Sequence, residues 1–130
     1  MASGPSVVWM VHKGVGPRGI RGELILEPER LIFRPELRAA RPDTLGETVL
    51  GLDQVRKVTR ARRSPVLELH VQTEGLPPVV LFYFVKPPDI YSSGAANPRS
   101  YAAAYLSNAA AVYEEEVADW LNAIRGRISS

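Results

Sequence analysis

The stretch VLELHVQTEGLPPVVLFYFV, residues 66–85, decides the fold class of this chain. Within it, Leu67, Leu69 and Val71 alternate with polar residues, which is the period of a β-strand with one buried face. A Gly- and Pro-rich turn follows, and residues 79–85 then form an apolar run that needs cover on both faces. The stretch therefore predicts two adjacent β-strands in a mainly β domain.

Outward from this pair, further segments show strand composition. The clearest are 23–27 and 31–34, which flank Pro28 and Glu29, two residues suited to the centre of a tight turn. This arrangement predicts a hairpin. With residues 7–11, 48–52 and 55–62, the predicted strands number about seven.

The last part of the chain predicts a helix. Asn97 is a suitable N-cap, Pro98 suits the first helical position, and Gly126 suits the C-terminal end. The pair Ser107-Asn108 marks a point at which so long a helix could bend or divide. One apolar stripe follows the helical period, with Trp120 expected to point inward: Tyr105, Ala109, Val112, Tyr113, Val117, Trp120, Leu121 and Ile124.

The order of elements predicts an α+β, mainly β fold, a bent β-barrel of about seven antiparallel strands closed by a C-terminal α-helix. The 130 residues suit a single domain. Its predicted parts are a flexible N-terminus, a barrel, a loop and the helix: residues 1–6, 7–88, 89–97 and 98–126.

Several function classes find no support in the composition. The chain has no cysteine, which excludes disulfides, thiolate zinc sites and a cysteine nucleophile. His12 and His70 are the only histidines, and neither has metal-ligand spacing or a neighbouring nucleophile. The N-terminus lacks signal-peptide character, and the longest apolar run is too short for a membrane span. We expect a cytoplasmic, non-catalytic protein without cofactor or metal.

Three segments resemble pleckstrin-homology-like domains of the GRAM-type branch. Residues 22–33 are similar to the branch's "G-x-L-x-L-T-x-x-R-L-I-F" hairpin, with Pro28 where a polar residue is usual. Residues 49–58 are similar to its "I-P-L-x-D-I-x-x-V" segment, and residues 120–124 to the tryptophan-bearing closing helix. The resemblance implies a scaffold that binds phosphoinositides, phosphopeptides, proline-rich peptides or other proteins, and fold alone does not choose among these.

The resemblance also implies an anion site. Phosphoinositide-binding members place basic residues at the end of the first strand and along the second, where this chain has Lys13, Arg18 and Arg21. The last spacing differs by one residue from the family pattern, which in a strand puts Arg18 and Arg21 on opposite faces. An ordinary solvated hairpin loop is the alternative interpretation.

A second basic segment lies in the predicted strand 55–62. Arg56, Lys57, Arg60 and Arg62-Arg63 place five cations within eight residues with no acid among them. They could meet an anionic membrane surface or an acidic protein. They could equally protect an exposed strand edge from aggregation. The run contains no aromatic residue, so stacking on nucleic-acid bases is not expected.

Tyrosines of the helix are the candidate protein contacts, because tyrosine combines a large apolar body with a polar tip. Tyr101 and Tyr105 are the first candidates. The leading prediction is an adaptor-like protein-interaction module that uses the helix and a neighbouring strand edge, where a peptide could add as a strand. A peripheral module for acidic or phosphoinositide lipid headgroups and a self-assembling subunit paired through the helix are the alternatives.

Overall fold

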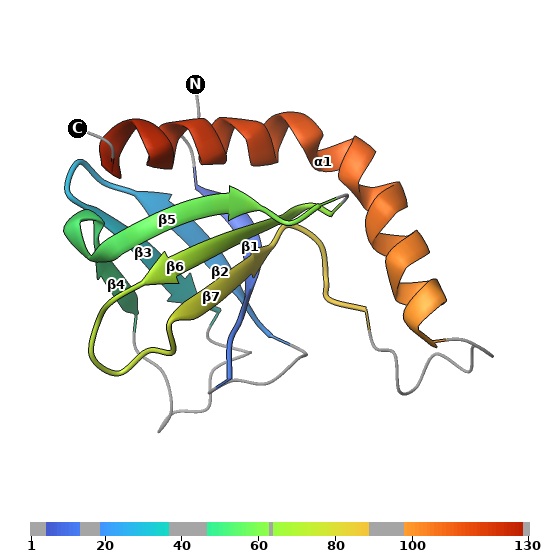
Figure 1. The fold of residues 1–130 in the computed structure, drawn as a ribbon, viewed down its shortest axis with the longest axis horizontal. Coiled ribbons are helices and arrows are strands. Elements are labelled where there is room, and N and C mark those ends of the chain that lie inside the picture. The colour runs from blue at the N-terminus through green and yellow to red at the C-terminus, as the bar shows by residue number, and fades with distance from the viewer. Residues whose placement is uncertain (1–4, 14–18, 37–46, 63, 89–97, 129–130) are drawn as a thin grey trace.

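The computed structural model describes residues 5–13, 19–36, 47–62, 64–88 and 98–128, which form seven strands, one 3₁₀ turn and one long helix (Figure 1). Every strand predicted from the sequence is present. Their bounds are β1 Ser6–Val11, β2 Ile20–Leu26, β3 Arg30–Pro35, β4 Thr48–Gly51, η1 Leu52–Gln54, β5 Val55–Arg60, β6 Val66–Val71, β7 Val79–Tyr83 and α1 Pro98–Ile128.

The hairpin of β2 and β3 forms where the sequence predicts it. Leu26 pairs with Leu31, and the Glu27 N–H donates a hydrogen bond to the Arg30 carbonyl at 2.9 Å, which closes the turn around Pro28. Leu24 and Leu31 are buried on the inner face. The alternating pattern therefore sets both the register and the buried face of this hairpin.

All seven strands belong to one antiparallel sheet in the order β4-β3-β2-β1-β7-β6-β5. The prediction of an antiparallel, mainly β domain with a C-terminal helix is confirmed. The predicted bent barrel is not confirmed: among the described residues the sheet is not closed, because β4 and β5 are its two edges and do not pair with each other. The sheet instead curves, so that β5, β6 and β7 lie in front of the remaining strands (Figure 1).

The core lies inside this curve, and α1 covers it. Phe33 on β3 and Phe82 on β7 meet across the core with ring centroids 6.0 Å apart. Val117, Trp120 and Ile124 of α1 are buried against the same cluster, as the sequence predicts for Trp120. The C-terminal half of α1 crosses the curved sheet beside β5 (Figure 1). A helix thus shields core residues that the open sheet leaves uncovered.

Two details of α1, its end and the place of Val112, differ from the prediction, which left open whether the helix bends or divides. The helix is continuous from Pro98 to Ile128, so it bends without dividing (Figure 1), and Gly126 lies within its last turn. Val112 is 77% exposed and lies off the buried stripe, whereas Ala110 is buried. At about 100° per residue Ala110 lies about 20° from Val117 around the helix, whereas Val112 lies about 140° from it, so Ala110 and not Val112 shares the buried face.

The N-terminal prediction also changes. Ser6 is not part of a flexible leader, because it begins β1 and is buried. The predicted loop 89–97, with its N-cap Asn97, and the first four residues of the chain lie outside the described residues.

Candidate functional site

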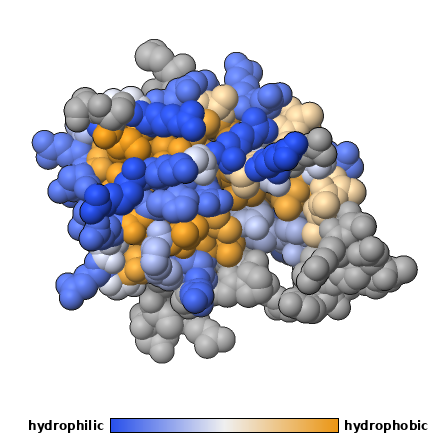
Figure 2. Space-filling view, in the orientation of Figure 1, coloured by the Kyte–Doolittle hydropathy of each residue, from blue (hydrophilic) through white to orange (hydrophobic). Residues whose placement is uncertain are grey.

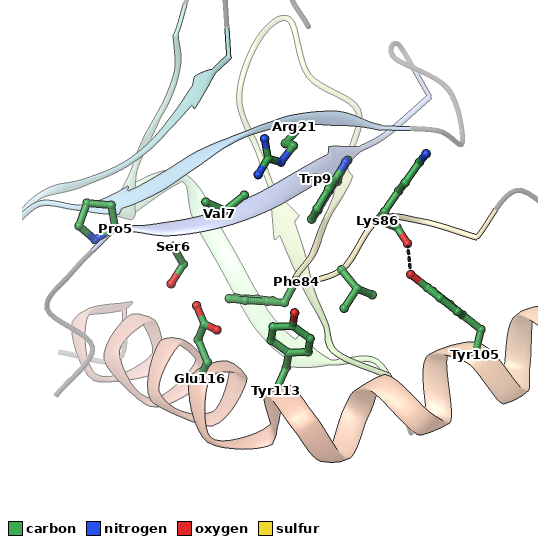
Figure 3. A pocket seen from close by; sticks show the side chains of 11 residues that line it. Pro5, Ser6, Val7, Trp9, Arg21, Phe84, Lys86, Tyr105, Tyr113 and Glu116 are labelled. Carbon is green, nitrogen blue, oxygen red and sulfur yellow. Dashed lines mark hydrogen bonds between the residues drawn. The ribbon is translucent and has the colours of Figure 1, made fainter. Parts of the chain in front are cut away.

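A groove opens where β7 leaves its neighbour β1. The two strands pair only from Trp9 to Val11, opposite Tyr83 to Leu81. Beyond Tyr83 the chain stays bonded on the β6 side, where the Phe84 N–H donates a hydrogen bond to the Pro65 carbonyl at 2.9 Å, but it pairs no further with β1. The start of β1, the segment after β7 and the facing side of α1 then border an open groove of about 510 Å³ (Figure 3). That volume falls within the range of roughly 300–1,000 Å³ typical of ligand sites.

The direction of the β1 backbone follows from its pairing with β2. Along an antiparallel strand, the backbone groups of successive residues point alternately to the two sides. The Arg21 carbonyl accepts a hydrogen bond from the Glu36 N–H at 3.0 Å, so the backbone N–H and C=O of Arg21 point away from β1. Gly22 therefore faces β1, where it pairs with Val8. Since Val8 faces β2, the N–H and C=O of Val7 face the opposite side.

That opposite side is the groove. Trp9 faces the same way as Val7 and pairs with Tyr83, but the register between β1 and β7 ends at this pair. Within the described residues, Val7 has no strand opposite it on the groove side. Val7 is also 43% exposed. The groove therefore contains a short strand edge whose one N–H and one C=O have no strand partner among the described residues.

Trp9 and Arg21 form a stacked pair above the groove. They lie opposite each other on β1 and β2 in a non-hydrogen-bonded position, where side chains approach most closely. The Arg21 guanidinium carbon lies 5.5 Å from the centroid of the Trp9 ring, a cation–π contact. Arg21 also forms an ion pair with Glu36 at 2.5 Å. Both contacts keep the indole ring in place beside the groove.

The two ends of the groove differ in charge. Figure 3 shows Glu116 beside Ser6 at one end and Lys86 with Tyr105 at the other. The Tyr105 hydroxyl donates a hydrogen bond to the Lys86 carbonyl at 3.0 Å, which ties α1 to the segment after β7. Neither the Glu116 carboxylate nor the Lys86 ammonium has a charged partner in the described parts of the chain. Apolar side chains, including Phe84, lie between the ends.

The structure does not gather the predicted anion site into one cluster. Lys13 is exposed just after β1, Arg21 is engaged as described above, and Arg18 lies outside the described residues. Arg56 and Lys57 are exposed on β5, with β6 and β7 between them and β1. Because Arg18 lies outside the described residues, the site of Lys13, Arg18 and Arg21 stays a prediction.

The basic segment of β5 lies on an edge strand. This position is consistent with the interpretation that its cations protect an exposed strand edge from aggregation. Arg56 donates a hydrogen bond to the Gln72 side chain. Arg60 donates to the Ser64 carbonyl at 3.3 Å and lies 3.8 Å from Glu114 of α1, so the helix supplies an acid that the segment itself lacks. Figure 2 shows this side of the molecule as bands of hydrophilic residues with apolar residues between them.

The predicted protein-contact tyrosines have different outcomes. Tyr105 lines the groove, whereas the side chain of Tyr101 lies outside the described residues although its backbone belongs to α1. Sequence reasoning missed Val7, Lys86 and Glu116. The apolar run 79–85 was the available signal. It is longer than the segment of β7 that pairs with β1, so its last residues border a groove and not a neighbouring strand.

In the part of the chain that the structure describes, no helix combines the length and the apolar character needed to cross a membrane.

Comparisons with known proteins add little to this description. No protein-family model matches the chain, and no curated protein matches it. A solved structure of the C-terminal domain of an unknown protein from Leishmania infantum is similar, with 18% identity, a TM-score of 0.42, and coverage of 68% of this chain and 74% of that one. A similarity at this level assigns neither a fold family nor a function.

Proposed function

We propose that this chain is a non-catalytic, cytoplasmic protein-interaction module on a pleckstrin-homology-like scaffold, and that it holds an extended peptide in the groove beside Val7. The observation that carries the proposal is the strand edge of Val7, which faces an open groove and has no β7 residue paired with it. A peptide residue opposite Val7 could exchange two backbone hydrogen bonds with it.

The scaffold part of the proposal rests on the sequence resemblance and on the order of elements. The hairpin, the central segment and the tryptophan-bearing helix that carry the resemblance fall on β2–β3, on β4 to β5 and on α1. Domains of that kind hold peptides among other ligands, and a curved sheet capped by one helix suits such a scaffold.

The lining of the groove favours a peptide over a phosphorylated headgroup. The partly exposed Trp9 and Tyr113 provide apolar surface, and the charges at the two ends have opposite signs. A headgroup needs several cations that converge on one point, whereas a peptide needs backbone partners and apolar side-chain contacts.

Val49 offers a matched control for Val7. The Arg30 carbonyl faces β2, where it accepts a hydrogen bond from the Glu27 N–H, so Leu31 faces β4 and pairs there with Leu50. Val49, the neighbour of Leu50, therefore points its N–H away from the sheet. Val49 is 46% exposed, close to the 43% of Val7, but lies on the far edge strand and not in the groove.

The test is a random peptide library displayed on phage and selected on the full chain. Selected peptides are then synthesised and titrated against the chain and against Val7→Pro and Val49→Pro. Proline removes one N–H and is tolerated where that N–H faces away from a neighbouring strand. We expect Val7→Pro to weaken binding by about tenfold, because a backbone hydrogen bond and the fit of the strand are lost, and Val49→Pro to bind normally.

Two further measurements keep the test decisive. If Val7→Pro unfolds, hydrogen exchange of the Val7 amide in the unmodified chain replaces it, with slower exchange expected when peptide is bound. The proposal is wrong if no peptide is selected, or if selected peptides leave the Val7 amide unchanged. Co-sedimentation with acidic phospholipid vesicles at low salt, combined with no selected peptide, would favour the lipid-binding alternative instead.

A further inference from the structure

The opposite charges at the two ends of the groove lead to a statement about its ligand that rests on the proposed function. We propose that the bound peptide runs antiparallel to β1 and carries an acidic residue before, and a basic residue directly after, the residue that pairs with Val7. The charge order of the ligand, and not its net charge, is then the basis of selection.

The direction of the bound peptide is inferred from the direction of β7. This strand lies on the same side of β1 as the groove and runs antiparallel to it, up to the pair of Trp9 and Tyr83. A peptide residue beside Val7 takes the same direction, because antiparallel pairing is slightly more stable per residue than parallel pairing. Tyr83 occupies the position opposite Trp9, so the peptide residues before the partner of Val7 lie off the β1 ladder. The N-terminal part of the peptide then lies toward Lys86 and its C-terminal part toward Glu116, as the two ends are arranged in Figure 3.

The basic residue follows from the side on which Ser6 points. In an antiparallel pair, directly opposite side chains lie on the same face of the sheet. The residue after the one that pairs with Val7 lies opposite Ser6, whose side chain points toward Glu116 (Figure 3). Glu116 is half-buried and has no cationic partner within the described ranges. A ligand cation at this position compensates a carboxylate that is partly removed from water.

The acidic residue of the peptide is inferred from Lys86, at the opposite end of the groove. Lys86 is exposed there, and its ammonium has no ion-pair partner among the described residues, whereas Arg21 is already paired with Glu36. Between Lys86 and Glu116, buried Phe84 and half-buried Tyr113 favour an apolar ligand residue. The expected sequence pattern of the peptide is acidic, apolar, any residue, then basic, and the third of these residues pairs with Val7.

Two synthetic peptides of identical composition test this order. The first is acetyl-Gly-Ser-Glu-Val-Thr-Lys-Val-Ser-Gly-amide, and the second exchanges its Glu and Lys. Both are titrated against the full chain by NMR. We expect the first to bind at least about fivefold more tightly, because two pairs of opposite charges replace two pairs of like charges in partly exposed positions. The double variant Lys86→Glu with Glu116→Lys keeps the net charge and should reverse the preference.

The outcomes separate this inference from the proposed function. Equal binding of the two peptides, or the same preference in the chain and the double variant, would overturn the charge order but leave the groove as a peptide site, provided that Val7→Pro still reduces the binding of library-selected peptides. If neither peptide binds and no library peptide responds to Val7→Pro, both proposals fail. If the double variant does not fold, Lys86→Glu alone should remove the preference for the first peptide.

Discussion

The indole N–H of Trp120 donates a hydrogen bond to the hydroxyl of Ser6 at 2.8 Å, although the two residues are 114 positions apart in the chain. Trp120 is 2% and Ser6 8% exposed, so the bond lies inside the protein. It connects the last third of α1 to the first residue of β1. Because both elements border the groove, this bond also holds one end of the groove together.

Replacement of Ser6 by alanine should therefore destabilise the protein. The Trp120 N–H would remain buried without an acceptor, which costs about 1–3 kcal/mol in the free energy of unfolding. Urea denaturation of Ser6→Ala measures this loss. Ser107→Ala, at an exposed position of α1, is the control and should change stability by no more than about 0.5 kcal/mol. Equal stability of Ser6→Ala and the unmodified chain would show that water replaces the hydroxyl.

Gly22 of β2 should not tolerate a side chain. A Cβ at this position would lie 2.4 Å from the Arg34 carbonyl oxygen and 2.8 Å from the Phe33 ring, and neither backbone nor core can move freely. We expect Gly22→Ala to lower the free energy of unfolding by about 2–3 kcal/mol. Gly126→Ala, with no atom within 4 Å, should instead stabilise α1 by up to about 1 kcal/mol. Thermal unfolding of the two variants tests the contrast, which fails if Gly22→Ala melts like the unmodified chain.

The local parts of the fold could be predicted because they depend on neighbouring residues. Alternation in residues 66–71 and the turn after Leu26 determine strand, face and register over short distances. The helical period likewise identified Val117, Trp120 and Ile124 as buried.

The parts that could not be predicted depend on long-range geometry. Whether β4 meets β5 depends on the total curvature of the sheet, which no local pattern reports. The groove exists because the register between β1 and β7 ends at the pair of Trp9 and Tyr83, and an apolar run does not report where such a register ends. A spacing of three residues from Ala109 does not by itself place Val112 on the buried stripe, because Val112 lies about 140° around the helix from Val117.

The hydrogen bond from Tyr105 to the Lys86 carbonyl should restrain the N-terminal half of α1. Tyr105→Phe removes the donor, and a net loss of about 0.5–1.5 kcal/mol corresponds to roughly two- to tenfold faster local amide exchange. Hydrogen exchange followed by mass spectrometry across α1 measures this change. Tyr113→Phe, at a second tyrosine that lines the groove, is the matched control and should leave the exchange of the N-terminal half unchanged. If the two variants behave alike, the Tyr105 bond does not restrain the helix.

His12 should make the protein less stable in mild acid. Partial burial lowers the pKa of His12 below its ordinary value of 6.5, because removal from water disfavours the charged imidazolium. As the pH falls below about 6.5, the unfolded chain takes up a proton at this residue before the folded chain does, so the free energy of unfolding decreases. Above that pH both states are neutral at His12, and its contribution is constant.

Urea denaturation at several pH values between about 8 and 5 tests this sign, with His12→Gln compared with the unmodified chain. The variant should lose part of the decrease in stability below pH 6.5, because glutamine does not titrate. His70→Gln, in which the imidazole that lies 3.0 Å from Glu68 is removed, controls for the loss of a histidine elsewhere on the sheet. An unchanged pH dependence in His12→Gln, or a chain that becomes more stable as the pH falls below 6.5, would contradict the assigned direction.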